Sequence, residues 1–225
     1  MTVRLLTYTP NPEKVVAMAA RTCYTSMPLS KLEDKLTDEE VAKMVTKLSD
    51  MGHESPMEHA NFTFAIEGVS RALLAQITRH RMASYSVRSQ RYVKEAGCSY
   101  VVPDSISSNP LAASYYNAAL GAVSDAYDQL IKLGIPKEDA RMTLPNATET
   151  QMLVTINARS LHNFFHLRCC NRAQWEIREL ADEMLKLCRE VAPILFAKAG
   201  AACTYGPCSE GAMSCGHPRR NENEK

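Results

Sequence analysis

The side chains best suited to chemistry are concentrated in residues 76–92. They are Gln76, Arg79, His80, Arg81, Arg88, Ser89 and Arg91. Apolar spacing predicts a helix from Ser70 to Arg81, which would place Gln76, Arg79 and His80 on one face. Guanidinium groups bind phosphate oxygens through paired hydrogen bonds, and a basic helix end that only complements its own dipole needs one or two arginines. This stretch therefore favours a phosphate-bearing ligand.

A second polar cluster occupies residues 157–168 and includes Asn157, Arg159, Asn163 and Arg168. On a helix, Arg159 and Asn163 share a face because they are four residues apart. His162 and His166 have the same spacing, which zinc ligands also use, but no Glu follows His162 as the HExxH motif requires. We therefore favour a packed, hydrogen-bonded histidine pair over a metal site.

Two further groups could bind a metal. The loop of residues 53–59 has two histidines and two carboxylates. These side chains could bind a metal, act in acid–base catalysis, or simply form hydrogen bonds within the loop. Spacing alone favours the last of these. The tail carries Cys203, Cys208, Cys215 and His217, but its cysteine spacing differs from the closer pairs of structural zinc modules. We read it as a loose Gly-rich tail and expect no metal, with zinc as the alternative.

Composition limits the class of protein. The chain has 225 residues, is 45% hydrophobic and 23% charged, and carries a formal net charge of +1. This excludes disordered and rod-like proteins and argues against a protein that coats nucleic acid. No apolar stretch is long enough to span a bilayer, and no export signal is evident at the N-terminus. We therefore expect a cytoplasmic protein with reduced thiols.

Several elements must position these clusters. We expect a helix opened by Asn11-Pro12, a helix with a capping box at Thr37 and Glu40, and a strand over 61–66. Residues 84–93 read as irregular or extended, and a long helix should cover 111–133. A short strand over 153–156 then precedes a helix capped by Ser160 and an amphipathic helix from about 177 to 191.

The elements do not alternate regularly between strand and helix, and no Gly-, Ser- and Pro-rich linker separates two cores. One α+β domain is the economical interpretation. The chain contains neither GxGxxG nor GxxxxGK[ST], so it predicts neither a Rossmann dinucleotide site nor a P-loop.

The pattern as a whole resembles the flavin-dependent thymidylate synthases. Arg79-His80-Arg81, followed after seven residues by Ser89, matches the family signature RHRx7S, and Gln76 and Arg91-Tyr92 extend the match. The segment 53–59 is similar to the family's HE[ST]PxEH loop, and residues 157–177 resemble its C-terminal block. These matches keep the family order and cover most of residues 53–178.

The resemblance implies an α+β fold with a central sheet flanked by helices, assembled as a homotetramer with its sites where subunits meet. It implies a catalytic domain over residues 1–202 and a Cys/Gly-rich tail over 203–225. The expected reaction converts dUMP to dTMP with methylenetetrahydrofolate as carbon donor and NAD(P)H as reductant, through FAD. Neither a membrane nor a nucleic acid is an expected partner.

Roles for single residues follow from the same resemblance. The expected FAD contacts are Ser55, Arg79, His80, Arg81, Asn157, Arg159 and Asn163. The expected dUMP contacts are Gln76, Arg79, Ser89, Gln90, Arg91, Arg141 and Arg168. Among these, Arg168 resembles the family arginine that binds the uracil ring, and a fixed guanidinium there would stabilise negative charge as the ring becomes nucleophilic.

The chain departs from the commoner motif at Ser86 and Val87, where many members have Asn and Glu. No side-chain role is therefore carried onto Val87. Ser89 could serve as a nucleophile, but no base is assigned to activate it, and phosphate binding is simpler. Two alternatives stay open: a related nucleotide-modifying flavoenzyme with another carbon donor, and an RNA- or DNA-binding module that stacks bases on tyrosines.

Overall fold

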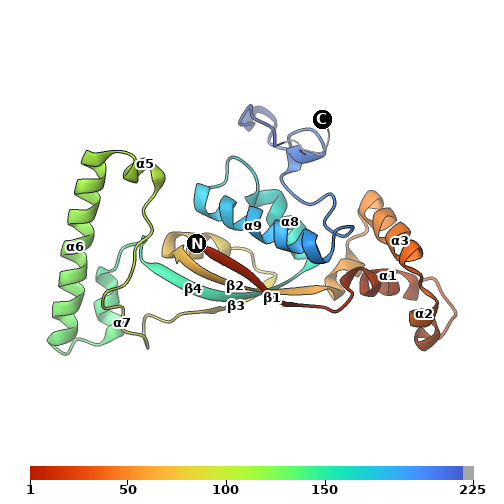
Figure 1. Ribbon diagram of the computed structural model, residues 1–225, viewed down its shortest axis with the longest axis horizontal. Helices are drawn as coiled ribbons and strands as arrows, with labels where there is room; N and C mark the ends of the chain where they lie inside the picture. Colours follow the sequence, from red (N-terminus) through yellow and green to blue (C-terminus); the bar gives the residue numbers. More distant parts are fainter. Residues whose placement is uncertain (220–225) are drawn as a thin grey trace. The chain divides into compact units, whose positions relative to one another are not determined.

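The computed structural model of the chain describes residues 1–219, and its centre is a four-stranded sheet in the order β1-β2-β4-β3 (Figure 1). The strands are β1 (Thr2–Tyr8), β2 (Asn61–Ser70), β3 (Ala83–Val87) and β4 (Glu149–Asn157). The central pair runs antiparallel, because Thr63 contacts Thr155 at one end and the Arg71 amide donates to the Thr148 carbonyl at the other. The expected α+β class, with helices beside a sheet, is confirmed.

The chain divides into two compact units. Unit 1 contains Met1–Thr2, Ile66–Arg79 and Ser86–Leu153. Unit 2 contains Val3–Ala65, His80–Tyr85 and the chain from Val154 onward. Strands β2, β3 and β4 each contribute residues to both units.

Unit 2 is built from helices packed against the sheet. Its α-helices are α1 (Pro12–Thr22), α2 (Leu29–Lys35), α3 (Asp38–Met51), α8 (Ala158–Arg168) and α9 (Trp175–Val191). Its 3-10 turns are η1 (Ser55–His59), η3 (Ala202–Thr204) and η4 (Gly211–Met213). Phe62 of β2, Phe165 of α8 and Phe196 after α9 are fully buried. The Phe196 ring meets the Phe62 and Phe165 rings edge-on, at centroid distances of 5.3 and 6.0 Å. This aromatic core fixes α8 against the sheet.

Unit 1 contains the longest helix of the described chain. Its helices are α4 (Arg71–Ile77), α5 (Asp104–Ser107), α6 (Pro110–Lys132) and α7 (Lys137–Ala140), with the 3-10 turn η2 (Arg141–Thr143). Helix α6 ends as predicted, at a left-handed Gly134 with φ 83°. Tyr127 is the only buried residue on the whole helix. Most of α6 is therefore left without an apolar partner inside unit 1.

The capping box on α3 is confirmed: Thr37 accepts from the Glu40 amide, and the Glu40 carboxylate accepts from the Thr37 amide. Two other predicted boundaries are wrong. Helix α4 ends at Ile77 rather than Arg81, so Arg79 and His80 lie beyond it and do not share a helical face with Gln76. Helix α8 is capped by Asn157 and not by Ser160, whose amide donates to the Asn157 side chain.

The extended segments are longer than expected. Strand β4 begins four residues before the predicted one, and β2 continues to Ser70. Part of the stretch expected to be irregular or extended forms β3, in line with the extended alternative, whereas β1 has no counterpart among the predicted elements. Strand β1 has no buried residue, and its alternation of Val3 and Leu5 with polar residues stops at Leu6, which makes it too short to identify a half-buried strand. Among the described helices, none combines the length and apolarity needed to cross a membrane.

Candidate functional site

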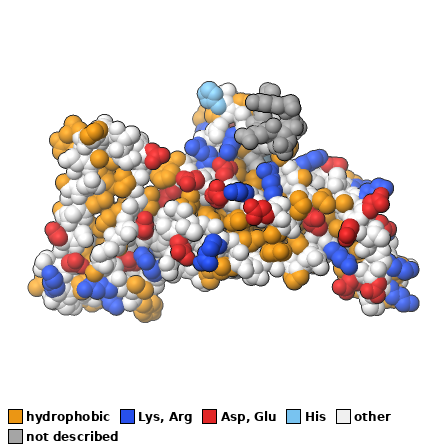
Figure 2. All heavy atoms as spheres, in the orientation of Figure 1, with side chains coloured by type: hydrophobic (Ala, Val, Ile, Leu, Met, Phe, Trp, Pro, Cys, Tyr) orange, Lys and Arg blue, Asp and Glu red, His pale blue; other side chains and the backbone are white. Residues whose placement is uncertain are grey.

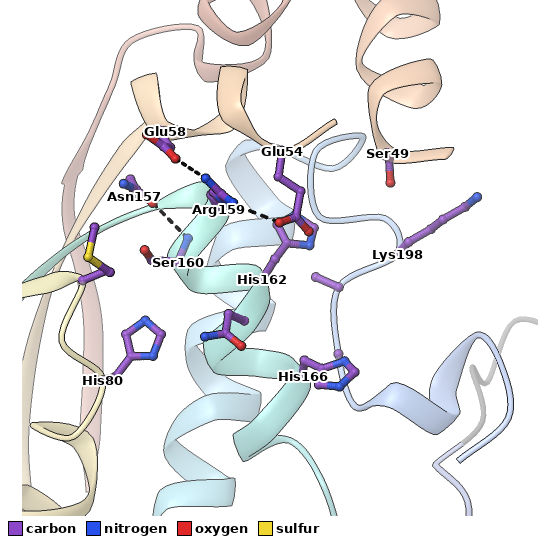
Figure 3. Close-up of a pocket in the computed structure, with 14 residues that line it drawn as sticks. Ser49, Glu54, Glu58, His80, Asn157, Arg159, Ser160, His162, His166 and Lys198 are labelled. Carbon is purple, nitrogen blue, oxygen red and sulfur yellow. Dashed lines mark hydrogen bonds and ion pairs between the residues drawn. The ribbon is translucent and has the colours of Figure 1, made fainter. Parts of the chain in front are cut away.

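The first turn of α8 carries the best-defined polar group of unit 2. The Asn157 side chain caps the helix by accepting from the Ser160 amide at 2.9 Å. The backbone of the next residue is fixed as well, because the Ala158 amide donates to the Ala60 carbonyl at 2.8 Å. Arg159 follows and projects from this anchored turn into a cavity (Figure 3). The cap and the strand thus set the direction of the arginine side chain.

Arg159 lies between two carboxylates of the 53–59 loop (Figure 3). Its Nη1 is 2.5 Å from Glu58 Oε1, and its Nε is 3.5 Å from Glu54 Oε2. The hydrogen bond with Glu58 and the charges of both carboxylates raise the pKa of Arg159, so the guanidinium is a permanent cation. All three side chains are about half exposed, so the arrangement contributes little to stability and mainly orients the arginine.

A cavity of about 690 Å³ opens beside this turn, entirely within unit 2. Four of the expected flavin contacts line it: His80, Asn157, Arg159 and Asn163. The rest of its wall consists of Ser49, Glu54, Glu58, Met82, Ser160, His162, His166 and residues 198–200. Its size falls within the range of small-molecule and cofactor sites.

His80 enters the cavity from the segment between α4 and β3. Its ring meets the buried Phe164 of α8 edge-on at 5.7 Å. Burial lowers the pKa of His80 and the nearby Arg168 charge lowers it further, against a hydrogen bond with the Ser160 backbone. His80 is therefore neutral at pH 7. Its Nε2 atom is buried without a hydrogen-bond partner in the described chain, which leaves it available to a ligand.

The remaining expected flavin contacts are placed differently. Ser55 and Arg81 are exposed and lie next in sequence to the lining residues Glu54 and Met82, but neither lines the cavity. Arg79 belongs to unit 1. Arg168 is half-buried at the last position of α8, and its charge contributes to the lowered pKa of His80.

Unit 1 gathers two expected dUMP contacts around one acidic residue. Arg91 Nε is 2.9 Å from the Glu138 carboxylate, and Arg141 Nε donates to the Glu138 carbonyl at 3.1 Å. Lys137 fixes the adjoining loop by donating to the Tyr92 carbonyl at 2.8 Å. Helix α7 therefore brings together two guanidinium groups that are fifty residues apart in the chain.

Two other expected dUMP contacts, Ser89 and Gln90, directly precede Arg91 in this loop. The Ser89 hydroxyl accepts from the Arg91 amide at 3.3 Å, a turn contact that shapes the loop. The Gln90 side-chain nitrogen is buried and has no partner among the described residues. Gln76 is half-buried on α4, and Arg79 is exposed just past its end, with its amide donating to the Gln76 carbonyl at 3.4 Å.

Arg88 does not serve as a free cation, in contrast to our interpretation of the arginine cluster. Its Nη2 contacts the carboxylate of the buried Glu95 at 3.0 Å and the Glu149 carbonyl at 2.9 Å. The Glu95 amide in turn donates to the Tyr127 hydroxyl at 3.1 Å. Arg88 thus ties the loop to β4 and α6 and is a structural residue.

Of the two histidines on α8, His162 is packed and hydrogen-bonded, as expected, and His166 is not. His162 stacks on Phe196 at 5.2 Å and shares a hydrogen bond with the Leu195 carbonyl at 3.0 Å. Burial lowers the pKa of His162. His166 is exposed at the edge of the cavity. Within residues 1–219, no three His, Cys, Asp or Glu side chains are grouped so that they could hold a metal ion.

Sequence reasoning missed the acidic residues that hold the arginines. The 53–59 loop stands out in the sequence, but its Glu54 pairs with Arg159, which lies 105 positions further along the chain. Glu138 carries no motif signal at all. Only the structure shows that Glu138, on α7, binds Arg91 through its carboxylate and Arg141 through its backbone carbonyl.

The chain resembles known proteins over most of its length. Residues 4–194 match the family described as "Thymidylate synthase complementing protein". Among solved structures, the UMP/dUMP methylase PolB from Streptomyces cacaoi, bound with 5-Br dUMP, is similar with a TM-score of 0.79 and 25% identity. That likeness covers 87% of this chain and 93% of the other.

Relatives of known name support the same family. A protein of Geobacter sulfurreducens named flavin-dependent thymidylate synthase is 51% identical over 96% of this chain and 94% of its own length. A Clostridium tetani protein with the same name is 48% identical over 95% of this chain and 92% of its own. With these relatives and the family match over most of its length, the chain belongs to the thymidylate synthase complementing family, that of the flavin-dependent thymidylate synthases.

Proposed function

We propose that the chain catalyses the flavin-dependent reductive methylation of dUMP to dTMP, with methylenetetrahydrofolate as carbon donor and NAD(P)H as reductant. Support comes from the names of the 51% and 48% identical relatives and from the dUMP analogue bound to the Streptomyces methylase. The observation that carries the proposal is the cavity of unit 2, because four residues expected at the flavin line it together.

The residues of this cavity suit FAD. Arg159 supplies a permanent cation for the pyrophosphate, and the unpartnered His80 Nε2 and the Asn163 amide supply hydrogen-bonding groups. When bound, FAD would supply the reducing equivalents, taken from NAD(P)H, that convert the transferred methylene unit into a methyl group. The protein contributes position and charge: the capped turn of α8 holds Arg159, and the Phe164 contact holds the His80 ring.

The arginines of unit 1 suit the phosphate of dUMP. A nucleotide phosphate is a dianion, and Arg91 and Arg141 offer two guanidinium groups held by one acidic residue. Exchanging the exposed Glu138 carboxylate for phosphate would free the Arg91 fork for paired hydrogen bonds. Ser89 supplies a hydroxyl and Gln90 a buried amide without a partner in the described chain. A phosphate-binding role for Ser89 needs no general base.

Arg168 is the residue we assign to the chemical step. A guanidinium beside the pyrimidine stabilises the negative charge that develops as C5 attacks the one-carbon donor. The neutral state of His80 fits this role, since a second cation beside Arg168 would be repelled. We carry no nucleophilic role onto Ser89 and no side-chain role onto Val87.

We also propose a homotetramer. The long helix α6 exposes large apolar side chains, including Leu111 at 67% and Tyr115 at 73%, while only Tyr127 on it is buried. Hydrophobic side chains follow this helix on the face drawn in Figure 2. Association with other copies of the chain would bury this surface, and apolar patches of this kind mark interaction sites.

A nucleic-acid-binding module is less well supported. On the face drawn in Figure 2, Lys and Arg side chains lie interspersed with Asp and Glu side chains, and the net charge is +1. Arg88, Arg91 and Arg159 are each engaged by a carboxylate of the protein itself. Among the described residues, the face drawn in Figure 2 shows no basic stripe of the kind that binds a phosphate backbone.

The test is dTMP production from dUMP, methylenetetrahydrofolate and NADPH under anaerobic conditions, with protein stripped of flavin and then given FAD. We expect dTMP only when FAD is restored, and none when the carbon donor or the reductant is omitted. Binding of FAD and dUMP without dTMP would point instead to a related flavoenzyme with another carbon donor. Failure to bind either ligand would contradict the proposal.

A further inference from the structure

The Cys-rich tail is tied to the turn that follows α8. Figure 1 shows it as the blue segment that folds back beside α8 and α9. Arg219 Nη1 donates to the Cys169 carbonyl at 2.6 Å and to the Asp182 carboxylate of α9 at 2.8 Å. Cys169 is the C-cap of α8 and directly follows Arg168. The tail therefore places a cation on one of the last residues of the helix that carries Arg168.

Two more contacts hold the same turn. The Asn171 side chain donates through its Nδ2 to the His217 carbonyl at 2.7 Å, and Arg172 is paired with Glu210 at 2.5 Å. Positions 169, 171 and 172 of the turn are thus each bound by a different part of the tail. A loose chain end would not make three successive contacts with one short turn.

The tail also shapes the surroundings of Arg168. A cavity of about 150 Å³ is lined by Arg168 from α8 and by Cys203, Cys208 and Glu210 from the tail. At the C-terminus of a helix, a guanidinium bound to a terminal carbonyl satisfies an unpaired acceptor and complements the helix dipole. Burial and the neighbouring Asp182 raise the pKa of the Cys169 thiol, so Cys169 stays neutral and adds no charge beside the ion pair of Arg219 and Asp182.

We propose that Arg219 is a positioning residue, which fixes the C-terminal turn of α8 and thereby holds Arg168 in its working place. The inference rests on the proposed function for the role of Arg168 in turnover, but not for the placement of Arg168 itself. It gives the tail a purpose that does not depend on a metal or a disulfide. It also predicts that damage at Arg219 affects the chemical step more than flavin retention, since the tail contacts lie at the other end of α8 from Arg159.

The placement of Arg168 has its own readout, because its charge lowers the pKa of His80. The histidine can be followed by NMR titration of the full-length, flavin-free protein, with its signal assigned by its loss in His80→Gln. In Arg219→Ala we expect the pKa of His80 to rise, since Arg168 is no longer held nearby. A defect that only loosened the tail would leave this titration unchanged.

The kinetic arm compares Arg219→Ala, Arg219→Lys and the wild type. We expect kcat to fall about tenfold or more in Arg219→Ala, because small displacements of a catalytic group are costly, with FAD binding little changed. Arg219→Lys keeps a cation on the Cys169 carbonyl and should restore most of the rate. Arg21→Ala is the matched control, since Arg21 forms an exposed ion pair with Glu40, 3.7 Å away, on helices remote in sequence from the tail.

Three outcomes would overturn the inference. The first is an Arg219→Ala variant with both kcat and the His80 titration as in the wild type. The second is a fall in kcat with an unchanged His80 titration, which would mean that Arg219 affects turnover without positioning Arg168. The third is an equal loss in the Arg21→Ala control. If the wild type itself makes no dTMP, the proposed function fails, and the His80 titration alone decides whether Arg219 positions Arg168.

Discussion

The two units hold their arginines in different ways. In unit 2, Arg159 projects from the capped first turn of α8 into a cavity and is flanked by two carboxylates of one loop. In unit 1, Arg91 stands in a loop and Arg141 in a 3-10 turn, and both contact Glu138 on a helix of four residues. A cofactor that stays bound benefits from a preorganised cavity, whereas a substrate that enters and leaves in each cycle suits an exposed loop.

The largest effect is expected at Arg168, to which we assign the chemical step in addition to its expected contact with dUMP. Arg168→Ala should lower kcat about 100-fold or more, the range seen when a group that stabilises developing charge is removed. FAD should remain bound, and the pKa of His80 should rise because a nearby cation is gone. Steady-state kinetics and flavin absorbance after gel filtration measure the first two effects, and NMR titration measures the third.

The control for this variant is Lys186→Ala, an exposed cation on α9. It should match the wild type in rate and flavin content. Unimpaired dTMP formation by Arg168→Ala would contradict the role that we assign to Arg168.

Arg91→Ala tests the loop of unit 1. Losing one charge-assisted contact to the phosphate should raise the KM for dUMP about 10- to 100-fold, because such hydrogen bonds contribute about 1.5–3 kcal/mol. The flavin content should be unchanged. Lys94→Ala removes an exposed cation from the same loop and should leave the KM as in the wild type. Equal effects on the KM in the two variants would mean that Arg91 acts only through its general positive charge and not through a direct contact with the phosphate.

Arg159→Ala tests the cavity of unit 2. Arg159 is about half exposed and already paired with carboxylates, so its loss should weaken FAD binding only about tenfold, equivalent to about 1.4 kcal/mol. Flavin retention during gel filtration and fluorescence titration of stripped protein give the measurement. Lys47→Ala on α3 is the matched loss of an exposed cation. A fully flavinated Arg159→Ala protein would remove this residue from the flavin site.

The smallest expected effect is on stability. Burial lowers the pKa of both His80 and His162 below 6.5, so the unfolded chain binds more protons than the folded one in mildly acidic solution. Stability should therefore be full above about pH 6.5 and fall as the pH decreases below it. Urea unfolding at pH 7.5 and 5.5 checks this, and His162→Gln should flatten the change; an unaltered dependence would exclude His162 as a contributor.

Local signals predicted much of the fold. The Thr37–Glu40 capping box, the alternating Phe62 and Phe64, and the Gly134 stop are short-range features, and each is confirmed. The predicted cap of α8 is wrong because Asn157 and Ser160 are both good capping residues, and the helix begins directly where β4 ends, at Asn157.

The site was less predictable because its contacts are long-range. The sequence singled out Arg91 and Arg159, but not that Glu138 and the 53–59 loop hold them, across 47 and 101 positions. Sequence reasoning also overestimated the positive charge available to a ligand, because Arg88 is paired with the buried Glu95. The tail has no recognisable spacing, and its role became visible only through the Arg219 contacts.

The measurement that tests this account most directly is a crossed binding experiment. Dissociation constants for FAD and for dUMP would be determined for the wild type, Arg91→Ala and Arg159→Ala. We predict that Arg91→Ala weakens dUMP and leaves FAD unchanged, while Arg159→Ala weakens FAD and leaves dUMP unchanged. If both variants weaken the same ligand to the same degree, or neither ligand binds the wild type, the division of labour between the two units is wrong.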